Sequence, residues 1–252
     1  MQTEFTPVTD AQWTLIEECM SVFCPKKHCL RAIYNAIQGI IRTGAQWRML
    51  DSKYPKWQAV YYYFRIGTKL GLWEKINALL VANERERQKR SASPSVYTTD
   101  SQSVKITLFT SDDKGIDGGK KINGRKRHVI TDVLGLIIKV KVRPANEHDA
   151  RGGCVLLAAA AENMTRGACI FADHAYGGMF KKLATEKGFT VEITGKPETA
   201  KGFVPAKKRW VVERTFGWFN SFRRLSKDYE KTILSSESMI YLAQSQILLN
   251  RI

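Results

Sequence analysis

The spacing of apolar residues changes near residues 91–95, and this change constrains the fold more than any other feature of the chain. Before it, apolar residues recur at intervals of three and four, as on one face of a helix. After it, short runs rich in β-branched residues, such as 95–101 and 124–144, indicate strands. The segment between them reads ERERQKR and then SASPS, which is typical of a linker. We therefore predict a small all-helical domain over residues 1–94 and a second domain over residues 95–252.

The first domain is predicted to hold about four helices. Thr9 or Asp10 can cap a helix that begins at residue 11, and Gly44 can end a helix that begins near residue 30. Two further helices are expected over residues 57–73 and 74–90. Short helices with basic surface residues are compatible with a helix-turn-helix-like DNA-binding unit, but any small helical bundle would show the same pattern.

The second domain is predicted to be α/β, because strands and helices alternate along it. Strands are expected at 95–101, 168–173 and 189–194, together with a hairpin whose hinge lies at 133–135. Helices are expected at 150–163 and near 177–188, with a long helix over 207–227 and a last one from residue 235. This order favours a mixed sheet flanked by helices.

The chain carries a large excess of positive charge. Of its 252 residues, 40 are Lys or Arg and 24 are Asp or Glu, which gives a formal net charge of +16. Such a charge suits a nucleic acid or an anionic membrane surface. The longest apolar run, Cys154–Ala161, is too short to span a bilayer, and the start of the chain has no signal-peptide pattern. We therefore expect a cytoplasmic protein without a membrane partner.

The five cysteines are an odd number, which favours a reducing compartment over a disulfide framework. Cys19, Cys24, His28 and Cys29 lie close together in the sequence and could form a zinc cluster. Their spacing matches no common zinc motif, so thiols on helices are the better interpretation.

Two predicted strands end in an acidic residue, Asp100 in VYTTD and Asp173 in ACIFAD. The carboxyl ends of such strands are where the sites of α/β proteins form. The alternative is that each aspartate closes its strand as a turn or cap residue. Asp132 is also acidic, but it lies in the predicted hairpin turn and is expected to be structural.

The predicted long helix has one acidic residue on a face that is otherwise basic or small. At about 100° per residue this face comprises Arg209, Glu213, Gly217, Asn220, Arg224 and Lys227. An exposed Arg209–Glu213 ion pair is the simpler interpretation. It does not account for Gly217, which weakens a helix but leaves space beside the carboxylate.

If Asp100, Asp173 and Glu213 come together, their charges repel unless a cation lies between them. Hard divalent ions such as Mg²⁺ or Mn²⁺ bind carboxylate oxygens. Two such ions can activate a water or a 3′-hydroxyl at a phosphodiester. A basic surface around an acidic pocket therefore suggests metal-dependent phosphodiester chemistry.

Several segments resemble the DDE transposases of bacterial insertion sequences, in particular the insertion sequence five family of the joint four/five superfamily. These segments are TDSQSVK, GIDGGKKINGRKRHVITDVLGLIIKVKVRPANEHDARGG, IFADHAYGG, RWVVERTFGWFNSFRRLSKDYE and, in the first domain, GAQWRML with YPKWQAVYYYFRIGTKLGLWEKI. The resemblance covers nearly the whole chain in order. It implies a ribonuclease H-like catalytic domain with Asp100, Asp173 and Glu213 as its catalytic and metal-binding triad.

The superfamily signature around the glutamate also includes Tyr, Arg and Lys positions. Arg209 matches the Arg, but Ala206 and Asn220 replace the Tyr and the Lys. Arg224 or Lys227 on the same predicted helical face could substitute for the missing Lys. The predicted DNA contacts are Arg209, Asn220, Arg224 and Lys227, with Lys120, Lys121, Arg125, Lys126 and Arg127 in a glycine-rich segment interpreted as a flexible loop on the DNA backbone.

The resemblance implies a transposase that binds the inverted terminal repeats of an insertion sequence, cleaves DNA and joins the freed end to a target. Its partners would be double-stranded DNA and a second copy of the chain, as a dimer or larger synaptic complex. Mg²⁺, replaceable by Mn²⁺, is the expected cofactor, with no small-molecule cofactor. The alternatives are a plain nuclease on the same scaffold and a domesticated DNA-binding protein that no longer cleaves.

Overall fold

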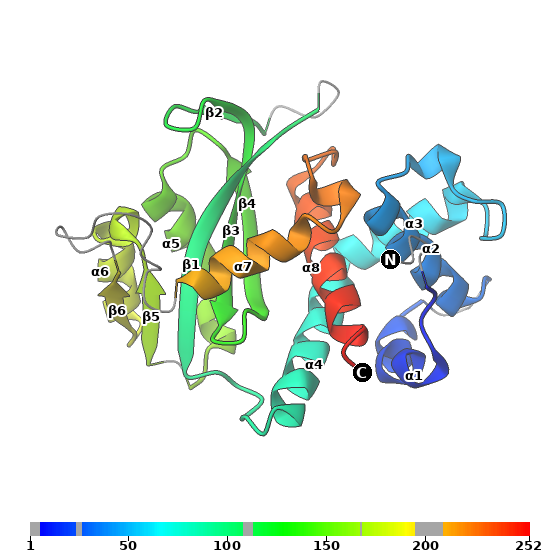
Figure 1. Ribbon diagram of the computed structural model, residues 1–252, viewed down its shortest axis with the longest axis horizontal. Coiled ribbons are helices and arrows are strands. Elements are labelled where there is room, and N and C mark those ends of the chain that lie inside the picture. Colours follow the sequence, from blue (N-terminus) through cyan, green and yellow to red (C-terminus); the bar gives the residue numbers. More distant parts are fainter. Residues whose placement is uncertain (1–5, 24–26, 108–112, 167, 195–208) are drawn as a thin grey trace.

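The computed structural model describes residues 6–23, 27–107, 113–166, 168–194 and 209–252. Its helical N-terminal part lies beside a six-stranded sheet, and the C-terminal helix lies between the two (Figure 1). Within these described ranges, every helix is too short or too polar to cross a membrane.

The N-terminal part consists of four α-helices and one short 3₁₀ helix. The α-helices are α1 (Asp10–Met20), α2 (Leu30–Thr43), α3 (Trp57–Lys69) and α4 (Leu72–Arg87), and η1 (Trp47–Met49) precedes α3. The predicted start of α1 is confirmed, because Thr9 and Gln12 form a reciprocal capping box. The predicted end of α2 is also confirmed, since Gly44 adopts the left-handed conformation with φ of 72°.

The sheet combines an antiparallel and a parallel half. Its strands are β1 (Val96–Lys105), β2 (Gly115–Asp117), β3 (Ile122–Asp132), β4 (Ile137–Pro144), β5 (Cys169–Ala172) and β6 (Thr190–Ile193). The order is β2-β3-β1-β5-β6, and β4 pairs with the edge of β3 that faces away from β1. β1 is antiparallel to β3 and parallel to β5, which is parallel to β6. The predicted mixed sheet flanked by helices is therefore confirmed.

Helices cover both faces of the sheet. On one face lie α5 (Asp149–Ala160) and α6 (Met179–Glu186), with η2 (Ala161–Asn163) and η3 (His174–Tyr176). The helix α7 (Trp210–Phe219) crosses β1 and β3, and η4 (Arg223–Leu225) leads from it to α8 (Ile233–Leu249) (Figure 1). Two glycines of α5 allow this helix to pack closely against β3 and η3. A Cβ on Gly152 would lie 2.2 Å from His128, and one on Gly153 would lie 2.6 Å from Tyr176.

The hydrophobic core runs through both predicted domains. One cluster of buried residues includes Ile37 of α2, Leu80 of α4, Val140 of β4, Phe216 of α7 and Leu242 of α8. α8 contacts α2 and α4 as well as β4, so it joins the helical part to the sheet. A second cluster lies between the sheet and α5 and α6. The boundary between two domains at residues 94 and 95 stays a prediction. The hydrophobic core is continuous across this boundary.

The predicted long helix over residues 207–227 is wrong at its C-terminal end. α7 ends at Phe219, and Asn220 is its C-cap. Phe222 then adopts an extended conformation with φ of −110° and ψ of 104°. Phe222 and Leu225 are nevertheless buried, because the chain turns them into the core through η4 rather than along a helix. The start of the predicted helix, like Ala206, lies outside the described residues.

The prediction that Arg125, Lys126 and Arg127 lie in a flexible loop is also wrong. These residues form part of β3, whose side chains are buried from Gly124 onward. β3 is an interior strand between β1 and β4, and α5 and α7 pack against it, so side chains on its two faces are covered. Each of the three cations contacts internal oxygen atoms, and none is free to reach a DNA phosphate at the surface.

Candidate active site

The two aspartates predicted from the strand ends come from neighbouring parallel strands. Thr98 of β1 pairs with Phe171 of β5, so two residues further along each strand Asp100 is level with Asp173. Residues at matching positions of adjacent strands are about 5 Å apart and point to the same side of the sheet. The topology therefore places these two carboxylates next to each other.

Asp100 lies in a largely buried position within β1, and its side chain is 15% exposed. Burial raises the pKa of this carboxyl to about 6, and the negative charges of Asp173 and Glu213 act in the same direction. The backbone N–H of Ser101, at 2.8 Å from Asp100 Oδ1, and the guanidinium of Arg209 oppose this rise. Asp100 therefore ionises less readily than an exposed aspartate.

Asp173 follows β5 directly and caps the 3₁₀ helix η3. Its Oδ1 accepts a hydrogen bond of 3.0 Å from the backbone N–H of Ala175. The capping role considered as an alternative is therefore present. It occupies one carboxylate oxygen of Asp173, and the charge of Asp173 still acts on Asp100.

Glu213 reaches the site from α7, which crosses β1. Arg209, one turn earlier, is 18% exposed, and its Nη2 lies 3.5 Å from Glu213 Oε1. The same Nη2 lies 3.5 Å from Asp100 Oδ2. The Arg209–Glu213 pair expected from the i,i+4 spacing thus exists, but it also joins the helix to Asp100 on β1. One guanidinium nitrogen lies between two acids that are 113 residues apart in the sequence.

The outward side of α7 next to Glu213 is open. A Cβ added to Gly217 would meet no atom within 4 Å, as expected for a glycine that leaves space beside the carboxylate. On the adjoining side, the guanidinium of Arg214 lies 4.6 Å from the ring centroid of Trp210 and 4.9 Å from that of Trp218. This stacking holds the Trp210 ring against Arg214 although nearly half of the surface of Trp210 is exposed.

The other predicted DNA contacts fall into two groups. Asn220 and Lys227 are exposed, as are Lys120 and Lys121 in the turn between β2 and β3. Arg224 is buried, and its Nε donates a hydrogen bond of 2.8 Å to Glu230 Oε1. Because α7 ends before them, Arg224 and Lys227 do not continue its helical face, and the prediction that they do is wrong.

Comparison with known proteins identifies the family of the chain. Residues 91–245, more than half of the chain, match the family described as "Transposase DDE domain". The chain belongs to the DDE transposase family. Residues 8–77 match a second family, "Putative transposase of IS4/5 family", so the family is of the IS4/5 type. Transposases act on DNA, in keeping with the positive charge of the chain.

A Burkholderia cepacia protein named "Putative transposase for insertion sequence element IS402" is 29% identical to the chain over 115 residues. The matched region covers 43% of the chain and 54% of that relative. The chain therefore aligns with about half of the relative's length.

The sequence did not predict a polar cluster of Ser101, Asp149 and Lys126 in this DDE transposase. Ser101 Oγ donates a hydrogen bond of 2.7 Å to Asp149 Oδ1, and Lys126 Nζ lies 3.1 Å from the same oxygen. Asp149 is the first residue of α5, and the cap of α5 is the side chain of His148, which accepts a hydrogen bond from the N–H of Ala150. The signal available in the sequence was only an acidic residue at the start of a helix.

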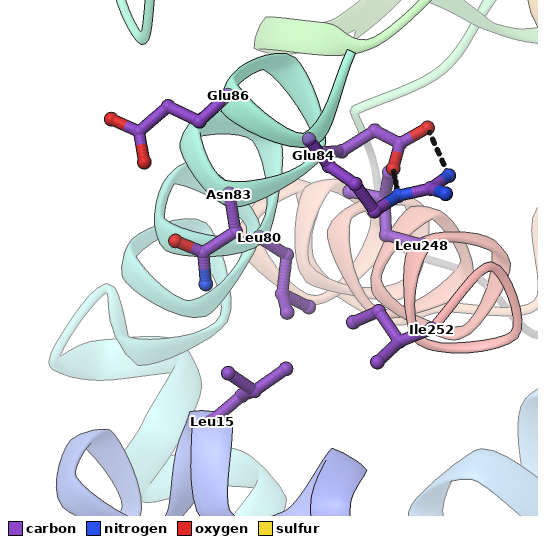
Figure 2. A pocket seen from close by; sticks show the side chains of 8 residues that line it. Leu15, Leu80, Asn83, Glu84, Glu86, Leu248 and Ile252 are labelled. Carbon is purple, nitrogen blue, oxygen red and sulfur yellow. Dashed lines mark hydrogen bonds and ion pairs between the residues drawn. The ribbon is translucent and has the colours of Figure 1, made fainter. Parts of the chain in front are cut away.

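A separate pocket of the transposase lies away from the acids. Its volume is 340 Å³, and α1, α4 and the C-terminal residues line it (Figure 2). Leu15, Leu80, Leu248 and Ile252 point into it, and Arg87 pairs with Glu84 at its edge. It contains none of the triad residues.

The donor chemistry of Asp100, Asp173 and Glu213 fits Mg²⁺ or Mn²⁺, because carboxylate oxygens are the ligands these ions prefer. A cation, the Arg209 guanidinium, already lies between two of the three acids. Among the described residues, no three His, Cys, Asp or Glu side chains are grouped closely enough to hold a metal ion. This also applies to Cys19, His28 and Cys29, while Cys24 lies outside the described residues.

Proposed function

We propose that the chain is a metal-dependent transposase that binds the inverted terminal repeats of an insertion sequence, cleaves the DNA at its ends and joins the freed 3′-hydroxyl to target DNA. The observation that carries the proposal is that Arg209 Nη2 lies 3.5 Å from both Asp100 Oδ2 and Glu213 Oε1, within a chain of the DDE transposase family. Asp173, at the end of the strand next to β1, acts on Asp100 through its charge. The strand order, with an antiparallel half joined to a parallel half through β1, supports a ribonuclease H-like catalytic domain.

In this proposal the carboxylates of Asp100, Asp173 and Glu213 would hold two Mg²⁺ ions. The ions would supply a hydroxide or alkoxide nucleophile and stabilise charge on the leaving oxygen. The buried position of Asp100 fixes its side chain between β1 and α7. Glu213, 48% exposed, lies on the side from which DNA can approach.

The proposed cleavage forms a bond between a water oxygen and phosphorus and breaks the bond from phosphorus to the 3′-oxygen, which takes up a proton. In strand transfer, that 3′-hydroxyl attacks a target phosphodiester and the target's own 3′-oxygen leaves. Arg209, Asn220 and Lys227 are proposed to contact phosphates near the site, and Lys120 and Lys121 a more distant part of the DNA. The N-terminal helices are proposed to bind terminal repeats or a second copy of the chain.

The test is a strand-transfer assay with the full chain, Mg²⁺ or Mn²⁺, and oligonucleotides that carry the DNA flanking its gene. Joined products support a transposase, cut products alone support a plain nuclease, and binding without cutting supports a domesticated DNA-binding protein.

The variants Asp100→Asn, Asp173→Asn and Glu213→Gln should each abolish cleavage and retain DNA binding. The matched control is Glu186→Gln at an exposed position on α6, which should leave cleavage unchanged. Wild-type cleavage by any one of the three variants would remove that residue from the triad.

A further inference from the structure

The structure points to Arg209 as the residue that couples DNA binding to metal binding, an inference that rests on the proposed function. We propose that its guanidinium occupies the metal position in the free protein and leaves it for a DNA phosphate. The acids would then become available to a divalent ion only when DNA is bound.

The first step is the position of the guanidinium. Nη2 of Arg209 lies 3.5 Å from Asp100 Oδ2 and 3.5 Å from Glu213 Oε1, so a single nitrogen contacts two of the three proposed metal ligands. A guanidinium carries one positive charge and cannot be deprotonated under ordinary conditions. The guanidinium balances part of the negative charge of the acids, but unlike a metal ion it cannot bind and activate a water molecule. A divalent ion and this guanidinium therefore compete for the same two carboxylates.

The second step is that the contact is loose enough to exchange. Both distances are long for charge-assisted hydrogen bonds, which are usually 2.7–2.9 Å. Nε of Arg209 is buried and has no hydrogen-bond partner among the described residues. The Nε–H of Arg209 is therefore a hydrogen-bond donor that is shielded from water and has no acceptor among the described residues.

The third step is the identity of a better partner. A phosphate offers a guanidinium two parallel hydrogen bonds, a geometry that two separate carboxylates do not provide here. DNA that approaches the open side of α7, over Gly217, meets Glu213 and Arg209 together. Transfer of Arg209 to a phosphate would release Asp100 and Glu213 and bring a phosphate oxygen to the metal ligands at the same time.

The consequence is positive cooperativity between two ligands. DNA should raise the affinity for a divalent ion, and the ion should raise the affinity for DNA by the same factor. We expect Mn²⁺ to bind the DNA-bound protein at least about tenfold more tightly than the free protein, within the usual range of such couplings.

The experiment measures Mn²⁺ binding by electron paramagnetic resonance or calorimetry, with the full chain at pH 8, in the absence and presence of a DNA duplex. Arg209→Gln should bind Mn²⁺ about tenfold more tightly than the wild type without DNA, and the effect of DNA on its Mn²⁺ affinity should nearly disappear. The matched control is Arg214→Gln on the same helix, whose guanidinium contacts Trp210, Trp218 and the carbonyl oxygen of Leu134 instead. This control should bind Mn²⁺ as the wild type does.

Equal Mn²⁺ affinity of the wild type with and without DNA, or no tightening in Arg209→Gln, would overturn the coupling. Failure of the proposed function gives a different result, because Asp100→Asn and Asp173→Asn would then bind Mn²⁺ as well as the wild type. Thermal unfolding of each variant verifies that a change in Mn²⁺ affinity is not a loss of folded protein.

Discussion

Arg85 of α4 forms a buried ion pair with Asp132 at the end of β3. Oδ1 of the same aspartate accepts hydrogen bonds of 2.9 Å from the backbone N–H groups of Leu134 and Leu136, which fixes the β3–β4 turn. The structural role expected for Asp132 is confirmed. The pair also joins the N-terminal helices to the sheet.

We expect Asp132→Asn to destabilise the chain by about 3–5 kcal/mol, because the substitution leaves the Arg85 charge buried without its partner. Urea unfolding followed by circular dichroism measures this loss. The control is Asp51→Asn, which breaks the exposed Lys53–Asp51 pair and should change stability by less than about 1 kcal/mol. Equal effects of the two substitutions would contradict the structural role of the buried pair.

The affinity for Mn²⁺ should depend on pH through Asp100. Burial and the nearby Asp173 and Glu213 charges raise the pKa of Asp100 to about 6, and only the ionised carboxylate binds a cation. We therefore expect the Mn²⁺ affinity of the free protein to fall as the pH decreases below 6 and to level off above 7. Calorimetry between pH 5 and 8 tests this.

Arg209 lowers the pKa of Asp100, so in Arg209→Gln the same fall in Mn²⁺ affinity should begin at a higher pH. An Mn²⁺ affinity that stays constant from pH 5 to 7 in the wild type would show that Asp100 is not a ligand.

His128 should make the fold sensitive to acid. Its side chain is fully buried on β3, and neither ring nitrogen has a hydrogen-bond partner among the described residues. Burial lowers its pKa from 6.5 to about 4, so the folded chain holds it neutral. The unfolded chain binds more protons between these two values, and stability must therefore decrease as the pH falls from 6.5 to about 4.

The expected loss from His128 is up to about 3 kcal/mol over this range. Urea unfolding at pH 7 and pH 5 should show a smaller difference for His128→Gln than for the wild type, whatever the absolute stability of the variant. His174→Gln, at an exposed position, should keep the wild-type difference. An unchanged difference in His128→Gln would assign the acid sensitivity to other groups.

Substitutions of Gly217 can distinguish an effect on the stability of the fold from an effect on the access of DNA to Glu213. It lies inside α7 with no atom within 4 Å of an added Cβ, so Gly217→Ala should stabilise the fold by about 0.5–1 kcal/mol. Gly217→Leu should fold equally well but fill the space beside Glu213, and it should weaken DNA cleavage. Cleavage by Gly217→Leu at the wild-type rate would show that DNA does not pass over this position.

The elements that could be predicted from the sequence are those whose signals are local. The capping box at Thr9, the left-handed Gly44 and the β-branched run before Asp100 each act over a few residues. Asp100 and Asp173 could be proposed together because parallel strands bring their carboxyl ends to one edge. The i,i+4 spacing of Arg209 and Glu213 also predicted their contact.

The predictions that were wrong concern residues whose environment is set by distant parts of the chain. Phe222 continues the helical spacing of α7, but its burial comes from η4 and from packing in the shared core. Arg127 looked like a surface cation, yet it donates to the carbonyl oxygen of Leu225, 98 residues away. The contact between Arg209 and Asp100 likewise spans 109 residues and leaves no local trace in the sequence.

The position of α8 has a consequence for how this transposase can evolve. Its last helix packs against α2 and α4 as well as β4, so the first and last parts of the chain complete each other's core. A different set of N-terminal helices could not be spliced in front of residue 95 without a matching change in α8. Under the proposed function, new specificity for DNA is therefore expected to arise by substitution on exposed helix faces rather than by exchange of whole modules between transposases.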